Sequence, residues 1–121
     1  MPRGIIKKKH GPEWIIQQKV IEFLRIRGWF VKVIHGSTFQ TGMPDLYICK
    51  RTYGSRWCEI KNPLAYRFTA AQLETFPRLA SEGVGIWILT AATEEEYQKL
   101  FTNPNWWVYL KTPDMNPAKN K

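Results

Sequence analysis

The chain has 121 residues, of which 44% are hydrophobic, so it is long enough to form one compact domain with its own core. Its net charge of +8 favours a polyanionic partner, most simply nucleic acid, although a merely solubilising surface would carry the same charge. No apolar run is long enough to span a bilayer or to act as a signal peptide, which argues against a membrane protein and predicts a soluble, cytoplasmic one.

The first part of the chain predicts a basic arm, a helix and a strand. Residues 1–12 carry several lysine and arginine side chains and predict a flexible arm. Pro12 and Glu13 begin a helix, because proline is favoured in the first helical turn, and Gly28 ends it. Residues 29–34 are β-branched or aromatic for the most part and predict a strand.

The middle of the chain predicts two strands, a helix and a further strand. Residues 45–50 and 56–61 are strand-like runs on either side of a short turn. Thr69 begins a second helix, which ends at Gly83. Residues 84–90 are mostly apolar and predict a strand buried on both faces.

The last part of the chain predicts a short third helix, an edge strand and a polar tail. The third helix starts at about Thr93, the edge strand covers residues 105–110, and the tail covers residues 111–121. The order of elements is therefore α-β-β-β-α-β, followed by a helix and a strand. This order predicts an α/β domain in which helices flank a central mixed sheet.

Two acidic residues lie at the two ends of the predicted hairpin. Asp45 opens its first strand and Glu59 lies fourteen residues later, near the end of the second. Pairing centred on residue 52 sets Asp45 opposite Glu59, and pairing centred on residue 53 sets it opposite Lys61. In either register all three side chains share one face, because side chains alternate along a strand. Ile60 then points into the core.

These residues have the chemistry of a site for a hard cation. The Asp45 and Glu59 carboxylates, with the backbone carbonyl of Ile60 between them, suit Mg²⁺ or Mn²⁺. Lys61 would orient or help deprotonate a water, or neutralise charge developing on a phosphate. The alternative is a surface hairpin with a cross-strand ion pair. Cys49 and Cys58 lie on opposite faces and outside any CxxC pattern, so neither a disulfide nor a structural zinc site is expected.

The order and spacing of these residues resemble a known nuclease superfamily. The Pro-Asp pair at 44–45 and the Glu-Ile-Lys run at 59–61 are similar to the motifs of PD-(D/E)xK nucleases. The wider frame, with Gly42 before Pro-Asp, Asn-Pro at 62–63 and Gln72 on the next helix, resembles the VRR-NUC (virus-type replication-repair nuclease) family. Archaeal Holliday-junction resolvases share the same core more distantly.

The resemblance covers residues 13–90 and implies a restriction-endonuclease-like core within a single nuclease domain, residues 13–110. It also implies a role for each matching polar residue: metal binding for the Asp and Glu, assistance to catalysis for the Lys, and a place at the site for the Gln. These roles fall on Asp45, Glu59, Lys61 and Gln72. Gln72 also fits a capping box with Thr69, and the two interpretations are compatible.

The family has a further acid on the first helix, and here the sequence differs. The expected position falls on Gln17, whereas Glu13 lies one turn earlier. Both share a helical stripe with Val20 and Leu24, which is expected to face inward. Either Glu13 or Gln17 is therefore a candidate for an additional metal ligand, and the number of metal ions stays open.

The resemblance implies a Mg²⁺- or Mn²⁺-dependent endonuclease that hydrolyses DNA, including branched or junction DNA. It further implies a homodimer, and a phage or bacterial origin. Basic side chains are the candidates for holding the DNA backbone: Lys7, Lys8, Lys9 and Arg67. The alternative is a non-catalytic nucleic-acid-binding domain on a nuclease-like scaffold, which the intact Asp45, Glu59 and Lys61 disfavour and the absent acid at Gln17 favours.

Overall fold

The structure is a computed structural model that describes residues 11–34 and 41–110. Most of the predicted basic arm, with Lys7, Lys8 and Lys9, and all of the predicted polar tail lie outside the described residues. The elements are α1 (Pro12–Ile26), β2 (Phe30–Val33), β3 (Leu46–Lys50), β4 (Gly54–Ile60), α2 (Ala70–Ser81), β5 (Ile86–Leu89), α3 (Glu94–Gln98), the 3₁₀ turn η1 (Lys99–Phe101) and α4 (Trp106–Leu110).

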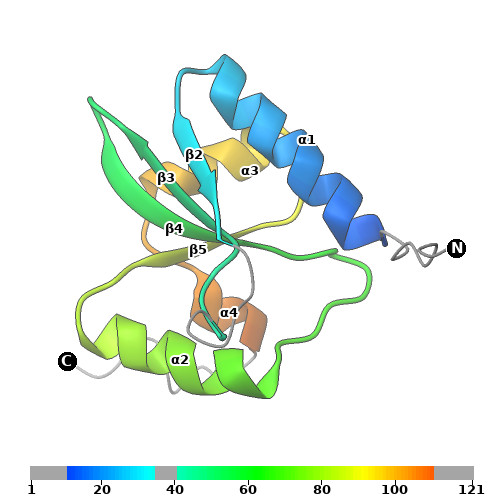
Figure 1. The fold of residues 1–121 in the computed structure, drawn as a ribbon, viewed down its shortest axis with the longest axis vertical. Helices are drawn as coiled ribbons and strands as arrows, with labels where there is room; N and C mark the ends of the chain where they lie inside the picture. Colours follow the sequence, from blue (N-terminus) through cyan, green and yellow to red (C-terminus); the bar gives the residue numbers. More distant parts are fainter. Residues whose placement is uncertain (1–10, 35–40, 111–121) are drawn as a thin grey trace, which may run out of the picture.

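The strands form one mixed sheet in the order β2-β3-β4-β5 (Figure 1). The β2–β3 and β3–β4 pairs are antiparallel, whereas β4 and β5 are parallel. The parallel pair requires a crossover, and α2 supplies it. The prediction of an α/β fold with a mixed sheet flanked by helices is confirmed.

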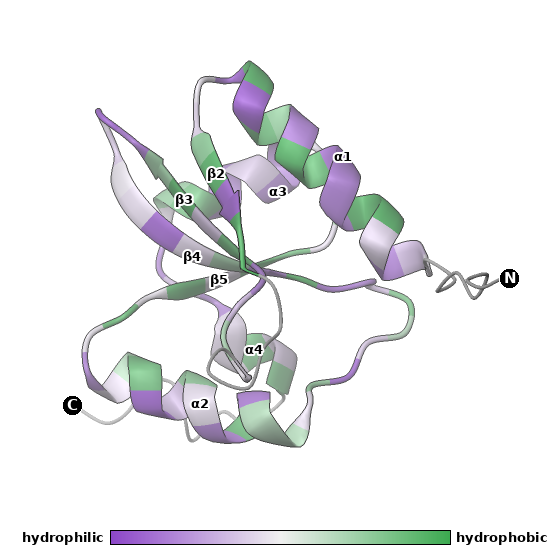
Figure 2. Ribbon diagram, viewed as in Figure 1, coloured by the Kyte–Doolittle hydropathy of each residue, from purple (hydrophilic) through white to green (hydrophobic). Residues whose placement is uncertain are grey.

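Helices cover both faces of the sheet, with α1 and α3 on one side and α2 and α4 on the other (Figure 1). The α1 side includes Val20, Leu24 and Ile60, whereas the α2 side includes Phe76 and Trp106. Figure 2 shows that hydrophobic and hydrophilic residues alternate in bands along α1, as expected of a helix that packs one side against the sheet. Alternation along the central strands therefore gives each face its own apolar core.

The β3–β4 hairpin adopts the first of the two predicted registers. Leu46 pairs with Cys58 and Lys50 with Gly54, so the hairpin is centred on residue 52. One step beyond Leu46, Asp45 lies opposite Glu59, and both belong to the α2 side of the sheet. Cys58 is buried among the residues packed under α1, and both cysteines are free, as predicted.

Residues 105–110 do not form the predicted edge strand. Residues 106–110 form α4, and Trp106 is buried under the sheet. The side-chain amide of Asn105 accepts a hydrogen bond from the Ile88 N–H at 2.6 Å and donates one to the Ile88 carbonyl at 3.3 Å. One side chain thus satisfies backbone groups of β5 that a further strand would have paired. Trp107 packs against the same core.

In the described parts of the chain, no helix has the length and apolar character needed to cross a membrane.

Candidate metal centre

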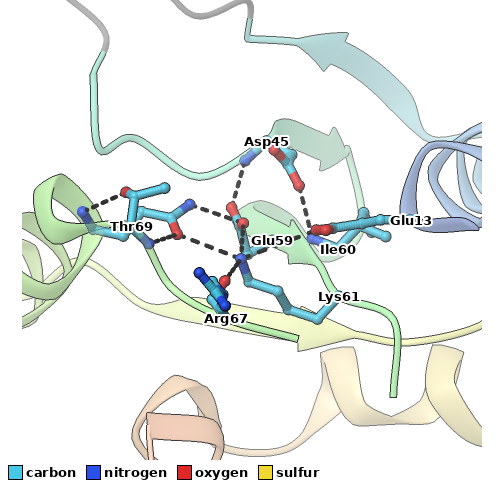
Figure 3. A network of polar contacts seen from close by, with 8 residues as sticks. Glu13, Asp45, Glu59, Ile60, Lys61, Arg67 and Thr69 are labelled. Carbon is cyan, nitrogen blue, oxygen red and sulfur yellow. Dashed lines mark hydrogen bonds and ion pairs between the residues drawn. The ribbon is translucent and has the colours of Figure 1, made fainter. Parts of the chain in front are cut away.

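Three carboxylates from separate elements meet at one end of the sheet (Figure 3). Glu13 comes from the first turn of α1, Asp45 from the residue before β3, and Glu59 from the end of β4. One oxygen from each lies within 4.8 Å of the others. We call these three residues the acid cluster.

Asp45 is fixed by hydrogen bonds along the hairpin. Its Oδ2 accepts from the Ile60 N–H at 2.9 Å, and its own N–H donates to Glu59 Oε1 at 3.1 Å. On its other side, the Asp45 carbonyl accepts from the Ile34 N–H at 2.8 Å. Asp45 therefore continues the β2–β3 pairing by one residue before β3 begins, and this sets its carboxylate beside Glu59.

Gly42 brings the Pro-Asp segment close to α2. It has a φ of +86°, and a Cβ at this position would lie 2.8 Å from the Ala71 carbonyl oxygen. An L-residue would be strained in this conformation and would also collide with the helix. The glycine before Pro-Asp thus has a structural reason, because it lets the segment with Asp45 approach the N-terminal turns of α2.

Glu59 is 2% exposed, and both oxygens of its carboxylate have polar partners. Oε1 accepts from the Asp45 N–H, while Oε2 accepts from Gln72 Nε2 at 2.8 Å and lies 3.0 Å from Lys61 Nζ. A buried carboxylate is tolerated only where it has partners of this kind.

Lys61 is 4% exposed and points into the same site (Figure 3). Besides Glu59, its Nζ donates to the Arg67 carbonyl at 2.9 Å and lies 4.0 Å from a Glu13 oxygen. The Phe68 ring centroid lies 4.4 Å from the ammonium. The ammonium is thus held between two carboxylates, a carbonyl and an aromatic face.

Gln72 forms the predicted capping box and also contacts the acid cluster. Its Oε1 accepts from the Thr69 N–H at 3.1 Å, and Thr69 Oγ1 accepts from the Gln72 N–H at 3.0 Å, which completes the capping box. The amide nitrogen of the same side chain binds Glu59. The start of α2 is therefore coupled to the acid cluster through one buried side chain.

The acid cluster holds protons more tightly than ordinary carboxylates do. Burial, then the charge of Asp45, raises the pKa of Glu59 to about 7, although Lys61 and Gln72 act in the opposite direction. Burial is also the main cause that raises the pKa of Asp45 to about 6. The pKa of Glu13 is raised by burial, which outweighs the effect of Lys61.

These pKa values predict that the metal-free protein loses stability as the pH rises from about 4 to about 7. The folded protein binds the protons of Asp45 and Glu59 more tightly than the unfolded chain, so their stabilising effect is full below pH 4 and lost above pH 7. Together the two raised pKa values correspond to a decrease of about 6 kcal/mol in the free energy of unfolding. Denaturant titrations in EDTA at a series of pH values measure it, and Asp45→Asn should remove about half of the slope, because burial still raises the pKa of Glu59. A stability that rises over this range would contradict the assignment.

The acid cluster fits a divalent cation in charge and ligand type. With all groups ionised, Glu13, Asp45 and Glu59 contribute −3 and Lys61 contributes +1, which leaves −2. Carboxylate oxygens are the ligands that Mg²⁺ and Mn²⁺ prefer. A bound cation would also offset the mutual repulsion that, after burial, helps to raise the pKa values of Asp45 and Glu59. A role for the Ile60 carbonyl as a further ligand stays a prediction.

The two candidates on α1 differ in position. Glu13 belongs to the acid cluster, whereas Gln17 is half-buried and its amide has no hydrogen-bond partner within residues 11–34 and 41–110. We therefore expect Glu13→Gln to raise the Mg²⁺ concentration for half-maximal metal binding about tenfold, since an amide is a weaker ligand than a carboxylate. Gln17→Glu, the reverse substitution one turn away, should change this Mg²⁺ concentration far less. Calorimetric Mg²⁺ titration tests this. Changes of equal size in the half-maximal Mg²⁺ concentration for the two substitutions would contradict it.

The structure brings several of the predicted site residues together. Asp45, Glu59, Lys61 and Gln72 lie together at one end of the sheet. Arg67 joins them through its backbone carbonyl, while its exposed guanidinium stays available for a ligand. The contribution of Phe68 was missed, because a phenylalanine between two elements carries no sequence signal for contact with a buried ammonium.

Comparisons of the chain with protein-family models, characterised proteins and solved structures gave no match.

Proposed function

We propose that this protein is a divalent-cation-dependent DNA endonuclease of the PD-(D/E)xK type, related to the VRR-NUC family. The observation that carries the proposal is the meeting of Glu13, Asp45 and Glu59 within 4.8 Å, with Lys61 Nζ 3.0 Å from Glu59. The order of these residues along the chain, on a hairpin followed by the α2 crossover, supports it, since the superfamily motifs have the same order.

The proposal assigns a distinct role to each polar residue. Asp45 and Glu59 hold Mg²⁺ or Mn²⁺, with Glu13 as a further ligand and the Ile60 carbonyl as a candidate. When bound, the cation lowers the pKa of a water and polarises the phosphate. Gln72 orients Glu59, since its amide nitrogen donates to Oε2.

Lys61 is suited to act on the phosphate. Its ammonium already lies among oxygen atoms, and it retains the flexibility of a four-carbon chain. A cation near the carboxylates would compete for Glu59 and release Lys61 to bind a phosphate oxygen or a water. Its positive charge would then stabilise the negative charge that develops during phosphodiester hydrolysis.

DNA is the proposed substrate because of the charge of the chain and the position of Arg67. The net charge is +8, and the exposed Arg67 guanidinium lies on the loop that contacts Lys61. Arg67 would hold a backbone phosphate next to the reacting one. Lys7, Lys8 and Lys9 are proposed to add non-specific phosphate contacts. The homodimer and the cleavage of branched DNA, implied by the resemblance, belong to the same proposal.

A panel of labelled DNAs tests the proposal. Single-stranded, duplex, flap and four-way-junction DNA would be incubated with the protein in Mg²⁺, Mn²⁺ or EDTA. We expect cleavage with either metal and none in EDTA, with 5′-phosphate ends. Tight, salt-dependent DNA binding without cleavage in either metal would instead identify a non-catalytic nucleic-acid-binding domain.

A further inference from the structure

A groove lies beside the acid cluster, and two of its lining residues, Arg67 and Phe68, contact Lys61. It has a volume of about 470 Å³, within the range of sites that take small organic ligands. It runs between the loop after β4, the first turns of α2 and the end of α4. The residues that matter for its chemistry are Leu64, Tyr66, Arg67, Phe68, Leu73 and Tyr109.

The groove connects directly to the proposed catalytic residues. Phe68 lines it and lies 4.4 Å from Lys61 Nζ, while the Arg67 carbonyl accepts from the same ammonium at 2.9 Å. A phosphate at the acid cluster would therefore have its neighbouring nucleotide next to the loop that carries Arg67 and Phe68.

The walls of the groove are suited to a flat aromatic ring. Tyr66 is half-exposed, and its ring is held by edge contacts to Phe68 and Tyr109 at centroid distances of 6.1 and 5.7 Å. Leu64 and Leu73 also line the groove, and they are 91% and 49% exposed to solvent. Aromatic rings that are fixed in place stack nucleobases with little dependence on sequence.

The charge of the groove favours a nucleotide over an uncharged apolar partner. Arg67 is the ionisable cation among its lining residues, and none of the described lining residues is acidic. A nucleotide brings both a flat base for Tyr66 and a phosphate for the guanidinium. A base within a duplex is paired and stacked on its neighbours, so only an unpaired base can enter.

We propose that this groove binds one unpaired nucleobase of the DNA strand, beside the phosphate that lies at the acid cluster. The proposal rests on the proposed function for its substrate class. It selects DNA with an unpaired nucleotide next to the cleavage site, such as a flap or an overhang, over continuous duplex.

The test uses fluorescence anisotropy with the whole protein in Ca²⁺, which takes oxygen ligands as Mg²⁺ does and offsets the charge of the acid cluster, and a gel checks that the probe stays intact. The probes are an overhang DNA and a set of copies in which one unpaired nucleotide at a time is replaced by an abasic analogue. For the wild-type protein, we expect one position at which loss of the base weakens binding about tenfold. Tyr66→Ala should bind the intact probe more weakly and should no longer distinguish the abasic copy.

Two further variants keep the test decisive. Tyr53→Ala removes a half-exposed tyrosine of the β3–β4 turn, whose ring packs against Trp29 and Phe101 and lies at the other end of the hairpin from the acid cluster, and it should bind DNA as the wild type does. Leu73→Glu places a negative charge in the groove at an exposed helical position, and should abolish discrimination even if Tyr66→Ala does not fold.

Three results would overturn the proposal. One is DNA binding by the wild-type protein that no abasic substitution weakens. Another is a change in oligomeric state caused by Leu73→Glu, which would assign the groove to a second copy of the chain. The last is absence of DNA binding, which would remove the proposed function as well. Binding and base discrimination without cleavage in Mg²⁺ would overturn only the catalytic part of the proposed function.

Discussion

Asp45→Asn should lower the single-turnover cleavage rate about 1000-fold while the protein stays folded. The substitution removes one carboxylate from the acid cluster, and a metal ion contributes several kcal/mol to such a reaction, with about 1.4 kcal/mol for each factor of ten. The asparagine oxygen can still accept from the Ile60 N–H, so the hairpin keeps its hydrogen bond. Loss of a charge from a repulsive cluster should leave the melting temperature in EDTA unchanged or slightly higher.

Glu22→Gln is the matched control for Asp45→Asn. Glu22 is exposed on α1, so its substitution makes the same change in net charge without touching the acid cluster. Rates and melting curves in Mg²⁺ should match those of the wild-type protein. Full activity of Asp45→Asn, or a loss of equal size in Glu22→Gln, would show that the acid cluster does not support cleavage.

Lys61→Met should separate catalysis from metal binding. Methionine preserves most of the length of the side chain but removes the ammonium that lies 3.0 Å from Glu59 and 4.0 Å from Glu13. We expect a loss of at least about 100-fold in cleavage rate, since one preorganised electrostatic contact commonly has this effect. Mg²⁺ should bind as tightly as before or more tightly, because a competing positive charge is gone.

The same substitution should destabilise the metal-free protein at pH 8. Removal of one partner of a buried ion pair leaves the other without compensation and costs about 3 kcal/mol. Saturating Mg²⁺ should restore part of this loss, since it binds the folded state. Cleavage rates, calorimetric Mg²⁺ titration and urea denaturation measure the three effects. Weaker Mg²⁺ binding together with unchanged cleavage would contradict the role given to Lys61.

Much of the fold could be predicted because local patterns and tertiary contacts agree. The helix that starts at Pro12 has a regular apolar stripe, and the helix that starts at Thr69 has a complete capping box. The segment 105–110 was predicted wrongly because aromatic and β-branched residues favour strands only when a sheet edge is free to pair. The Asn105 side chain forms hydrogen bonds with backbone groups of β5, and burial of Trp106 under the sheet then favours a helix.

The site could be predicted in part, since period-two alternation places Asp45, Glu59 and Lys61 on one face in either register. The choice between registers could not be made, because it depends on the geometry of the turn between β3 and β4. Nor could the sequence decide between Glu13 and Gln17, since both lie on one helical stripe. Which of the two side chains reaches Asp45 and Glu59 depends on where α1 crosses the sheet. The groove beside Arg67 combines three separate elements and has no local pattern at all.

Diffraction from a crystal soaked in Mn²⁺, measured at a wavelength where manganese scatters anomalously, is the sharpest test of the proposed metal centre. We expect an anomalous peak at about 2.2 Å from carboxylate oxygens of Asp45 and Glu59, with Glu13 adjacent. The Asp45→Asn variant, soaked in the same way, should show a much weaker peak. A fully occupied Mn²⁺ elsewhere in the molecule, with none between Asp45 and Glu59, would contradict the metal centre and the nuclease chemistry that depends on it.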